Sequence, residues 1–406
     1  MRLRTLALGA VLSAGGGAAV AQQAPQVPNV AHERQWNVDA RLAAYYETNI
    51  AHTGKAVARS RGIVPEDVRI TPQIAADIVQ PIGQSALFLN GVAGYDFHNR
   101  NDRLDRARYQ VTGGGTGVIG ICRPILYGTY SGLQSDLADL NLVTVENEQV
   151  TKGVSAGVQC GRPVGLNGGA TVQRFDTKNS ADRLVVQDHT AETLFVQLGY
   201  GSPNLVNASL FYSYANNEYP NRVIVGRPIG DGFFTETVGL QLQRRFGPRL
   251  TTGGSVSATR LKREFAPAGT KQKITATTYA ANASYRAGSR LELNMLAAKN
   301  VRPSDRPGKL FDVAESLEGS ARYRLGGRFN VVLGHVYQDV VSNVDTLQAG
   351  LVVTNSRLNA TYGQFEVRRV GNGSVTLDVR HERRDTNLPS FNYTSTRVGL
   401  ITSYSF

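Results

Sequence analysis

The last ten residues of the chain, Arg397-Val-Gly-Leu-Ile-Thr-Ser-Tyr-Ser-Phe406, alternate between larger apolar and smaller polar side chains. One set consists of Val398, Leu400, Thr402, Tyr404 and Phe406. The other set consists of Arg397, Gly399, Ser403 and Ser405. Because successive side chains of a β-strand point to opposite faces, this pattern predicts a strand with one apolar and one polar face.

The same alternation recurs over about ten residues at other places, which is typical of strands that cross a membrane in a barrel. It is clearest in the segments 36–47, 206–214, 290–297 and 375–382. The apolar face of the first segment consists of Trp36, Val38, Ala40, Leu42, Ala44 and Tyr46. A helix would instead need apolar residues three and four positions apart. We therefore predict an all-β protein.

The connections between these segments alternate between short and long. The short connections are rich in Gly and Pro, which supply the backbone dihedrals of tight hairpins. They comprise residues 81–84, 122–124, 161–163, 201–204, 247–249, 288–290, 326–328 and 371–373. The long connections comprise residues 51–67, 98–105, 216–232, 265–273, 303–312 and 385–391. Short turns on one side and longer loops on the other are the rule for outer-membrane barrels.

These connections predict the strand number. Each of the short turns joins two strands of a hairpin, and the first and last strands complete a transmembrane antiparallel up-and-down β-barrel of about 18 strands. Sixteen strands is the alternative, because the stretch 340–358 has the least regular pattern. A barrel of this size encloses an aqueous lumen. An even strand number places both termini on one side of the membrane, which we expect to be the periplasmic side.

Composition supports this class and argues against a helical membrane protein. The chain has 43 Gly among 406 residues and 19% charged residues, whereas soluble domains average about 7% Gly and about 25% charged residues. Outside the N-terminus, no run of 18 apolar residues could form a spanning helix. The hydrophobic 41% is instead spread one residue in two along the strands.

The N-terminus has the features of a secretory signal peptide over residues 1–21. Arg2 and Arg4 precede an apolar stretch, and Ala19-Val20-Ala21 is a cleavage site. We predict a periplasmic extension over residues 22–35 and a barrel over residues 36–406. In an exported protein, the terminal strand with Tyr404 and Phe406 resembles the insertion signal that the barrel-insertion machinery recognises. These features predict the Gram-negative outer membrane, with both termini in the periplasm.

Cys122 and Cys160 lie in similar contexts, Ile-Cys-Arg-Pro and Gln-Cys-Gly-Arg-Pro, each at the entry to a short turn. In the arrangement with 18 strands these turns follow strands 4 and 6, on the same side of the membrane. Because the periplasm is oxidising, we predict a disulfide between them. Two free thiols are the alternative. A metal site is not expected, since no His lies nearby.

Charged residues on the polar faces are the main candidates for function. They comprise Asp39, Arg41, Glu47, Arg286, Glu318, Arg322, Arg324, Asp378, Arg380, Glu382, Arg384 and Arg397. Closing the barrel puts the first strand beside the last, so Arg41, Arg397 and Arg380 would line neighbouring strands. One hypothesis is an Arg-rich wall that selects anionic or polyhydroxylated solutes. The equally weighted alternative is a set of salt bridges that only satisfies the polar wall.

Other motifs argue against catalysis and cofactors. Gly115-Thr-Gly-Val-Ile-Gly120 matches a dinucleotide fingerprint, but a turn and a strand follow it where a helix is needed. Asp188-His189 is the only adjacent Asp/His pair. We therefore expect no enzyme, no cofactor and no metal. The net charge of +12, or +10 without Arg2 and Arg4, is dispersed and does not indicate nucleic acid.

The segment after the first strand carries a family resemblance. Ala44-Tyr-Tyr-Glu-Thr-Asn is followed by Glu66-Asp-Val-Arg-Ile-Thr-Pro and by Leu87-Phe-Leu-Asn-Gly-Val-Ala-Gly-Tyr-Asp. These motifs resemble the beta-barrel porin-2 family of outer-membrane proteins, which is associated with exopolysaccharide biosynthesis and export. They lie in about the first 80 residues after the signal peptide, while the resemblance in architecture covers the rest. The resemblance implies a role in the passage of polysaccharide, not a reaction.

The resulting functional hypothesis is a monomer-competent outer-membrane channel associated with exopolysaccharide secretion. A general or solute-selective diffusion porin is the alternative, and a non-conducting structural or adhesion barrel is a further one. Expected partners are outer-membrane lipids, lipopolysaccharide and the insertion machinery, together with polysaccharide and proteins of an export complex.

Overall fold

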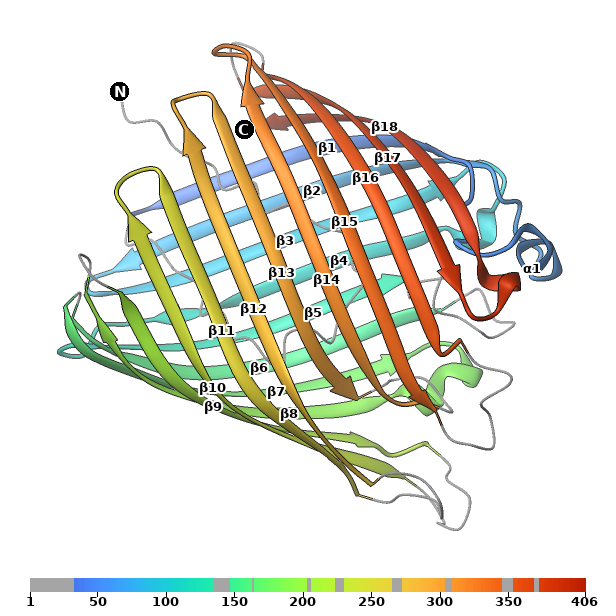
Figure 1. Cartoon of the computed structure of the whole chain (residues 1–406). Helices are drawn as coiled ribbons and strands as arrows, with labels where there is room; N and C mark the ends of the chain where they lie inside the picture. Colours follow the sequence, from blue (N-terminus) through green and yellow to red (C-terminus); the bar gives the residue numbers. More distant parts are fainter. Residues whose placement is uncertain are drawn as a thin grey trace.

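The computed structural model describes residues 33–134, 147–162, 164–202, 206–222, 230–264, 272–303, 309–344, 353–368 and 372–406. The predicted signal peptide and most of the predicted extension lie outside these residues. The described chain forms one antiparallel sheet of 18 strands that closes on itself (Figure 1).

The odd-numbered strands are β1 (Gln35–Glu47), β3 (Ser85–His98), β5 (Cys122–Gln134), β7 (Gly165–Asn179), β9 (Asn207–Tyr219), β11 (Leu250–Arg263), β13 (Leu291–Pro303), β15 (Phe329–Val344) and β17 (Gly373–Thr386). The even-numbered strands are β2 (Asp67–Ile82), β4 (Arg106–Thr116), β6 (Glu148–Gly161), β8 (His189–Gly201), β10 (Asp231–Phe246), β12 (Lys273–Ala287), β14 (Lys309–Arg324), β16 (Asn355–Arg368) and β18 (Tyr393–Ser405).

Each strand pairs with the next along the chain, and β18 closes the barrel against β1. The closing ladder runs from Asp39 opposite Ser405 to Glu47 opposite Arg397. The predicted all-β barrel of 18 strands is confirmed, and the alternative of 16 strands is wrong. Among the described residues, no helix is both long and apolar enough to cross a membrane.

The two ends of the barrel differ as the connections predicted. At one end, which we call the turn end, lie the short turns, the start of β1 and the end of β18 (Figure 1). At the other, the loop end, lie the longer connections with α1 (Lys55–Ser60) and the short 3-10 helices η2 (Asp102–Leu104), η4 (Asp182–Gln187) and η5 (Pro389–Phe391). Gly83, Gly247 and Gly288 have positive φ in three of the turns, where glycine adopts the left-handed conformation at no steric cost.

One turn lies elsewhere than predicted. Residues 117–121 form the turn between β4 and β5, so Cys122 does not enter a turn but begins β5. Gly120 has a φ of 63°, and the Cys122 N–H donates to the Ile119 carbonyl at 3.0 Å. The turn therefore depends on this glycine, whereas Pro124 lies within the strand. The fingerprint Gly115–Gly120 leads into β5 and not into a helix.

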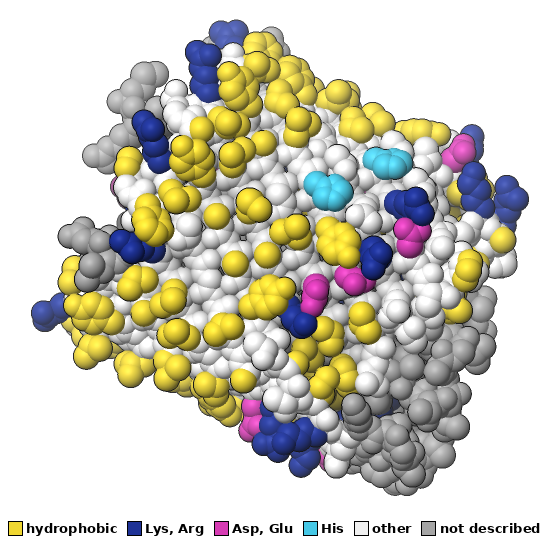
Figure 2. Space-filling view, in the orientation of Figure 1, with side chains coloured by type: hydrophobic (Ala, Val, Ile, Leu, Met, Phe, Trp, Pro, Cys, Tyr) yellow, Lys and Arg dark blue, Asp and Glu magenta, His cyan; other side chains and the backbone are white. Residues whose placement is uncertain are grey.

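The two faces of the wall differ in chemistry. Large apolar side chains are exposed on the outer face, such as Ile74, Leu198, Met295 and Leu333. Figure 2 shows apolar side chains spread over the visible part of the outer face, with charged groups at both ends and a further group of charged and His side chains between them. The lumen face of the same strands carries mainly Ser, Thr, Asn, Gln, Gly and charged residues. This arrangement suits a barrel whose outside contacts lipid and whose inside contacts water.

Glycines in the wall make room for aromatic rings on the neighbouring strand. A Cβ added at Gly399 would overlap the ring of Tyr45, which lies opposite it on β1. Gly334 has the same relation to Tyr362. Each ring lies over the bare backbone of the partner strand, so large lumen side chains fit without protruding. Part of the high glycine content therefore has a packing cause.

We expect Gly399→Ala to lower the free energy of unfolding by about 1–3 kcal/mol, because the added methyl group overpacks against Tyr45. Urea unfolding of protein refolded into lipid vesicles measures the change. Gly319→Ala is the matched control, since a Cβ there meets nothing within 4 Å. Equal stability of the two variants would contradict the packing role of Gly399.

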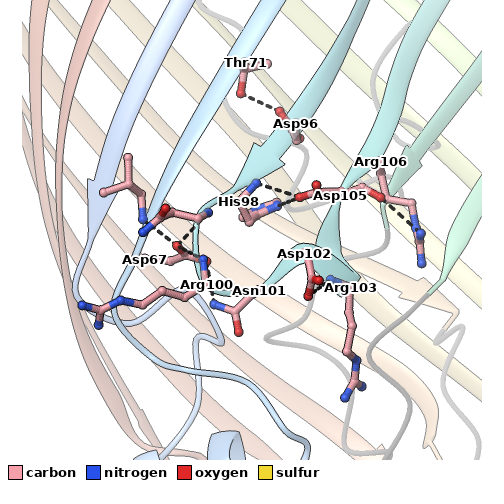
Figure 3. A network of polar contacts seen from close by, with 12 residues as sticks. Asp67, Thr71, Asp96, His98, Arg100, Asn101, Asp102, Arg103, Asp105 and Arg106 are labelled. Carbon is pink, nitrogen blue, oxygen red and sulfur yellow. Dashed lines mark hydrogen bonds and ion pairs between the residues drawn. The ribbon is translucent and has the colours of Figure 1, made fainter.

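Three of the connections at the loop end pack against one another. Ile50, Ala51, Ala58 and Ile63 from the β1–β2 connection pack with Leu104 and Leu184 from two other connections. Figure 3 shows the polar contacts beside this cluster. One oxygen of Asp67 accepts hydrogen bonds from the N–H groups of Asn99 and Arg100, and the other accepts from the Asn101 amide at 2.6 Å. These contacts fix the β1–β2 connection to the β3–β4 connection.

Asp67→Ala removes the acceptor of several backbone N–H groups at a buried position. We expect a loss of about 2 kcal/mol of local stability, because buried donors are left without partners. Limited proteolysis within residues 48–66 should become faster. Asp102→Ala in the same region is the control, since its contact with the Arg103 N–H is exposed. Unchanged cleavage in the Asp67 variant would show that other contacts hold the loop.

The ends of β13 and β14 at the loop end of the barrel lie on the lumen side of β9–β11. The β12–β13 ladder stops at Tyr279 opposite Lys299, although β13 stays paired with β14 as far as Pro303. Beyond this point a cluster joins Tyr219, Phe233 and Leu261 to Val301 and Phe311. The first three belong to the lumen face of β9–β11, and the last two to the outer face of β13–β14. These faces meet only if the hairpin end lies inside the wall, where it covers part of the loop end.

Candidate functional site: the charged wall of the lumen

The charged residues that β1, β17 and β18 contribute come together on one part of the lumen face. Arg397 lies opposite both Glu47 on β1 and Arg380 on β17. Its guanidinium donates to Asp378 at 3.0 Å, and Arg380 donates to Glu382 at 2.8 Å. These ion pairs are only partly exposed. The predicted residues at this level therefore neutralise one another, as the salt-bridge hypothesis expects.

His52 joins the β1–β2 connection to this cluster. Its Nε2 lies 2.6 Å from Glu47 Oε1 and 3.6 Å from Glu382 Oε1, and its ring stacks on Tyr393 at 5.3 Å between centroids. The hydroxyl groups of Tyr393 and Ser395 donate to Glu382 and Glu47, respectively. His52 has a φ of 47°, the only positive φ at a non-glycine residue in the described chain. Two carboxylates from β1 and β17 thus hold the loop against the wall.

Tyr45 places one further guanidinium group, that of Arg69, beside this cluster. The guanidinium carbon of Arg397 lies 4.9 Å from the centre of the Tyr45 ring, and that of Arg69 lies 5.2 Å from it. Arg69 is opposite Tyr45 on β2. Cations at this distance are attracted by the ring quadrupole. Tyr45 therefore keeps two arginines close together where their mutual repulsion would otherwise separate them.

Nearer the turn end the predicted charges are less neutralised. Within the described chain, no ion pair involves Asp39, Arg41, Arg322 or Arg324. Arg322 faces Glu292 across the β13–β14 ladder, and Arg324 lies at the end of β14. Alternate residues of each strand face the lumen, and all four of these residues occupy such lumen-facing positions. Guanidinium groups that form no ion pair there leave donors available to a passing carboxylate.

The predicted charged residues thus form two groups at different depths in the barrel. Asp378, Arg380, Glu382, Glu47 and Arg397 meet in one network, whereas Asp39, Arg41, Arg322 and Arg324 do not join it. Sequence reasoning did not identify His52, Arg69, Tyr393 and Ser395 as members of the network. The one available signal was Tyr45, an aromatic residue on a polar face between Arg41 and Glu47.

Other predicted sites have simple structural outcomes. Cys122 and Cys160 lie opposite each other on β5 and β6 and form a disulfide. Asp188 and His189 do not form a pair, since Asp188 accepts from Asn179 and His189 Nδ1 lies 2.9 Å from the Gln187 carbonyl. Tyr404 and Phe406 contact each other edge to face at the turn end. Their role as an insertion signal stays a prediction.

Together the closed sheet, the apolar outside and the charged lumen define a β-barrel of the outer-membrane type. The fold is similar to that of OccK2 (OpdF) from Pseudomonas aeruginosa, solved in complex with glucuronate, with 13% identity, a TM-score of 0.51 and coverage of 93% of this chain and 99% of that one. It is also similar to the FrpB iron transporter from Neisseria meningitidis (F5-1 variant), with 8% identity, a TM-score of 0.53 and coverage of 89% and 65%. At such identities the likeness concerns the fold alone. No family model matches the chain, and no curated protein matches it by sequence.

Proposed function

We propose that the protein is an outer-membrane diffusion channel that favours small anionic, hydroxyl-rich solutes such as sugar acids. The observation that carries the proposal is that Arg41, Arg322 and Arg324 lie on the lumen face and form no ion pair among the described residues. In a wide barrel such groups meet water, where a planar donor fork matches a carboxylate. The loop end would face the outside and the turn end the periplasm.

Two further observations support this choice. The loop-end charges are paired with each other, so they shape the entrance without a large field of one sign. OccK2, which has a similar fold, was solved with glucuronate, a carboxylate with several hydroxyl groups. The wall of this chain offers the matching chemistry, namely arginines beside Ser, Thr, Asn and Gln side chains.

The association with exopolysaccharide stays a prediction that rests on the sequence resemblance. An acidic oligosaccharide carries the same carboxylate and hydroxyl groups, so the wall described above would also suit it. Uptake of a glucuronate-containing oligosaccharide into vesicles would distinguish a polysaccharide route from a channel for monomers.

Reconstitution in planar bilayers tests the channel proposal. We expect discrete conductance steps and a reversal potential in a salt gradient that indicates preference for anions. Liposome swelling should be faster in glucuronate than in glucose at equal osmolarity, after correction for counter-ion flux. Absence of conductance would favour the non-conducting structural barrel, and a preference for cations would contradict the role of the arginines.

A further inference from the structure

A cavity of about 500 Å³ lies at the turn end of β9–β12, away from the charged wall. Its lining consists of Ser202, Asn207, Gln243, Arg244, Arg245, Pro248, Arg249, Thr251, Ser284 and Arg286. The site is thus formed by four consecutive strands and two of their turns. In the ring of 18 strands, β9–β12 lie opposite β1 and β18, which carry part of the ion-pair network at the loop end, whereas Arg322 and Arg324 on β14 lie two strands away from β12.

The strand register builds this cavity. Arg245 lies opposite Thr251, which in turn lies opposite Ser284 on β12. The Arg286 N–H donates to the Arg249 carbonyl at 2.7 Å, which joins the β10–β11 turn to β12. The lumen faces of three neighbouring strands therefore bring Arg245 and Arg286 to the same end, with Arg249 between them in the turn.

The charge of the cavity is not balanced by its lining. Four of the lining residues are arginines, and none is a carboxylate. Glu292 faces Arg286 across the β12–β13 ladder, but no ion pair joins them in the described chain. The Arg244 guanidinium lies on the outer face of β10, 4.5 Å from the centre of the Phe246 ring, so the charges on the lumen side come from Arg245, Arg249 and Arg286. Several positive charges lining one hollow create a field that attracts multivalent anions.

We propose that this cavity binds small polyanions that carry two or more phosphate or carboxylate groups. The guanidinium forks suit both oxyanions, and the hydroxyl and amide groups of Thr251, Ser284 and Gln243 suit the sugar or carbon chain between them. The volume lies within the range of about 300–1,000 Å³ that is usual for small-molecule sites. The site goes beyond the proposed channel function and does not depend on it.

The anion can come from two sources. A soluble polyanion would reach Arg245 and Arg286, which lie on the lumen parity of their strands. An anionic lipid headgroup would reach Arg244, whose side chain lies on the outer parity beside the membrane. The two sources share the same recognition chemistry and differ in which arginine they need.

Calorimetric titration of the full-length protein in neutral detergent with pyrophosphate tests the site without any need for conduction. We expect saturable binding that Arg245→Gln, Arg249→Gln and Arg286→Gln together weaken at least ~tenfold, about 1.4 kcal/mol. The control combines Arg123→Gln, Arg162→Gln and Arg328→Gln, which removes the same charge from other parts of the turn end, namely β5, the β6–β7 turn and the β14–β15 turn. It should change the affinity less than twofold.

Equal weakening in both triple variants would overturn the site, because the binding would then depend only on the overall charge. Absence of saturable binding to the unmodified protein would overturn it as well. Arg244→Gln separates the two sources. A soluble occupant predicts unchanged pyrophosphate affinity in this variant. A lipid occupant predicts that phosphatidylglycerol added to the micelles competes with pyrophosphate, and that Arg244→Gln abolishes this competition.

Discussion

Replacing Asp231 with asparagine should lower the free energy of unfolding by about 3–5 kcal/mol, because it removes the negative charge and one of the two acceptor oxygens that the buried Arg263 binds. Asp231 is fully buried at the start of β10 and binds Arg263 through two hydrogen bonds of 3.0 and 2.9 Å. Arg222 Nη1 also lies 3.4 Å from the same carboxylate. Both guanidinium groups lie against the aromatic rings of Tyr219 and Phe233, where water cannot replace the lost partner.

The consequence should extend beyond the ion pairs. Tyr219 and Phe233 belong to the cluster that holds Val301 and Phe311 on the lumen side of the wall. Loss of Asp231 is therefore expected to release the β13–β14 end as well as to lower stability. Urea unfolding in lipid vesicles measures the stability, and proteolysis near residues 304–308 measures the release.

Two control variants test the cause of this effect. Asp385→Asn removes an exposed partner of Arg383, which should cost no more than about 1 kcal/mol. Replacing Asp231, Arg222 and Arg263 together with leucine should recover much of the loss, since no buried charge then remains. A loss below about 1 kcal/mol for the Asp231 variant would show that the buried ion pairs do not stabilise this end of the barrel.

Reversing the charge of Arg41, Arg322 and Arg324 to glutamate should shift the anion-to-cation permeability ratio about a hundredfold towards cations. One unit charge at about 8 Å in water contributes about 0.5 kcal/mol. Three reversals change the charge of the wall by six units, which raises the energy of a monovalent anion and lowers that of a monovalent cation by about 3 kcal/mol each without salt. Screening by the electrolyte reduces the combined effect to about a hundredfold change in the ratio. Reversal potentials in planar bilayers measure the ratio. Low salt is needed, because the Debye length falls to about 10 Å at 0.1 M.

The matched control reverses Arg174, Arg260 and Arg357, which lie on the outer parity of β7, β11 and β16. This control has the same change in net charge but places none of it in the lumen. Its permeability ratio should stay within a few-fold of the unmodified protein. Equal shifts in the two triple variants would mean that selectivity follows total charge and not the free arginines of the wall.

The strands and turns could be predicted because their signals are local. Alternation over about ten residues identifies a strand, and Gly or Pro between two such stretches identifies a hairpin. The turn before Cys122 was misplaced by a few residues because Pro124 suggested a turn, whereas Gly120 forms it. The disulfide followed from the same count, since turns after strands 4 and 6 bring Cys122 and Cys160 to neighbouring strands.

The candidate sites were predictable only in part. The lumen-facing positions of Arg41, Arg380 and Arg397 could be predicted, because alternate residues of a strand point to the same face. Which carboxylate each arginine binds did not follow, because diagonal neighbours on adjacent strands compete and side-chain rotamers decide between them. Arg397 thus binds Asp378, although Glu47 lies directly opposite it. The cluster around Phe233 could not be foreseen, since it joins an outer face to a lumen face.

The sequence by itself predicted the fold class, about 18 strands in their order along the chain, and the face of each strand on which a side chain lies. These properties depend on residues that are neighbours in the chain, so the local composition and the two-residue period of the sequence indicate them. Only the tertiary structure decided how charges pair, where β13–β14 leaves the wall and how four arginines come to line one cavity. These properties depend on contacts such as that of Ser395 with Glu47, which are 348 residues apart. Closure of the barrel creates such contacts, and no local pattern encodes them.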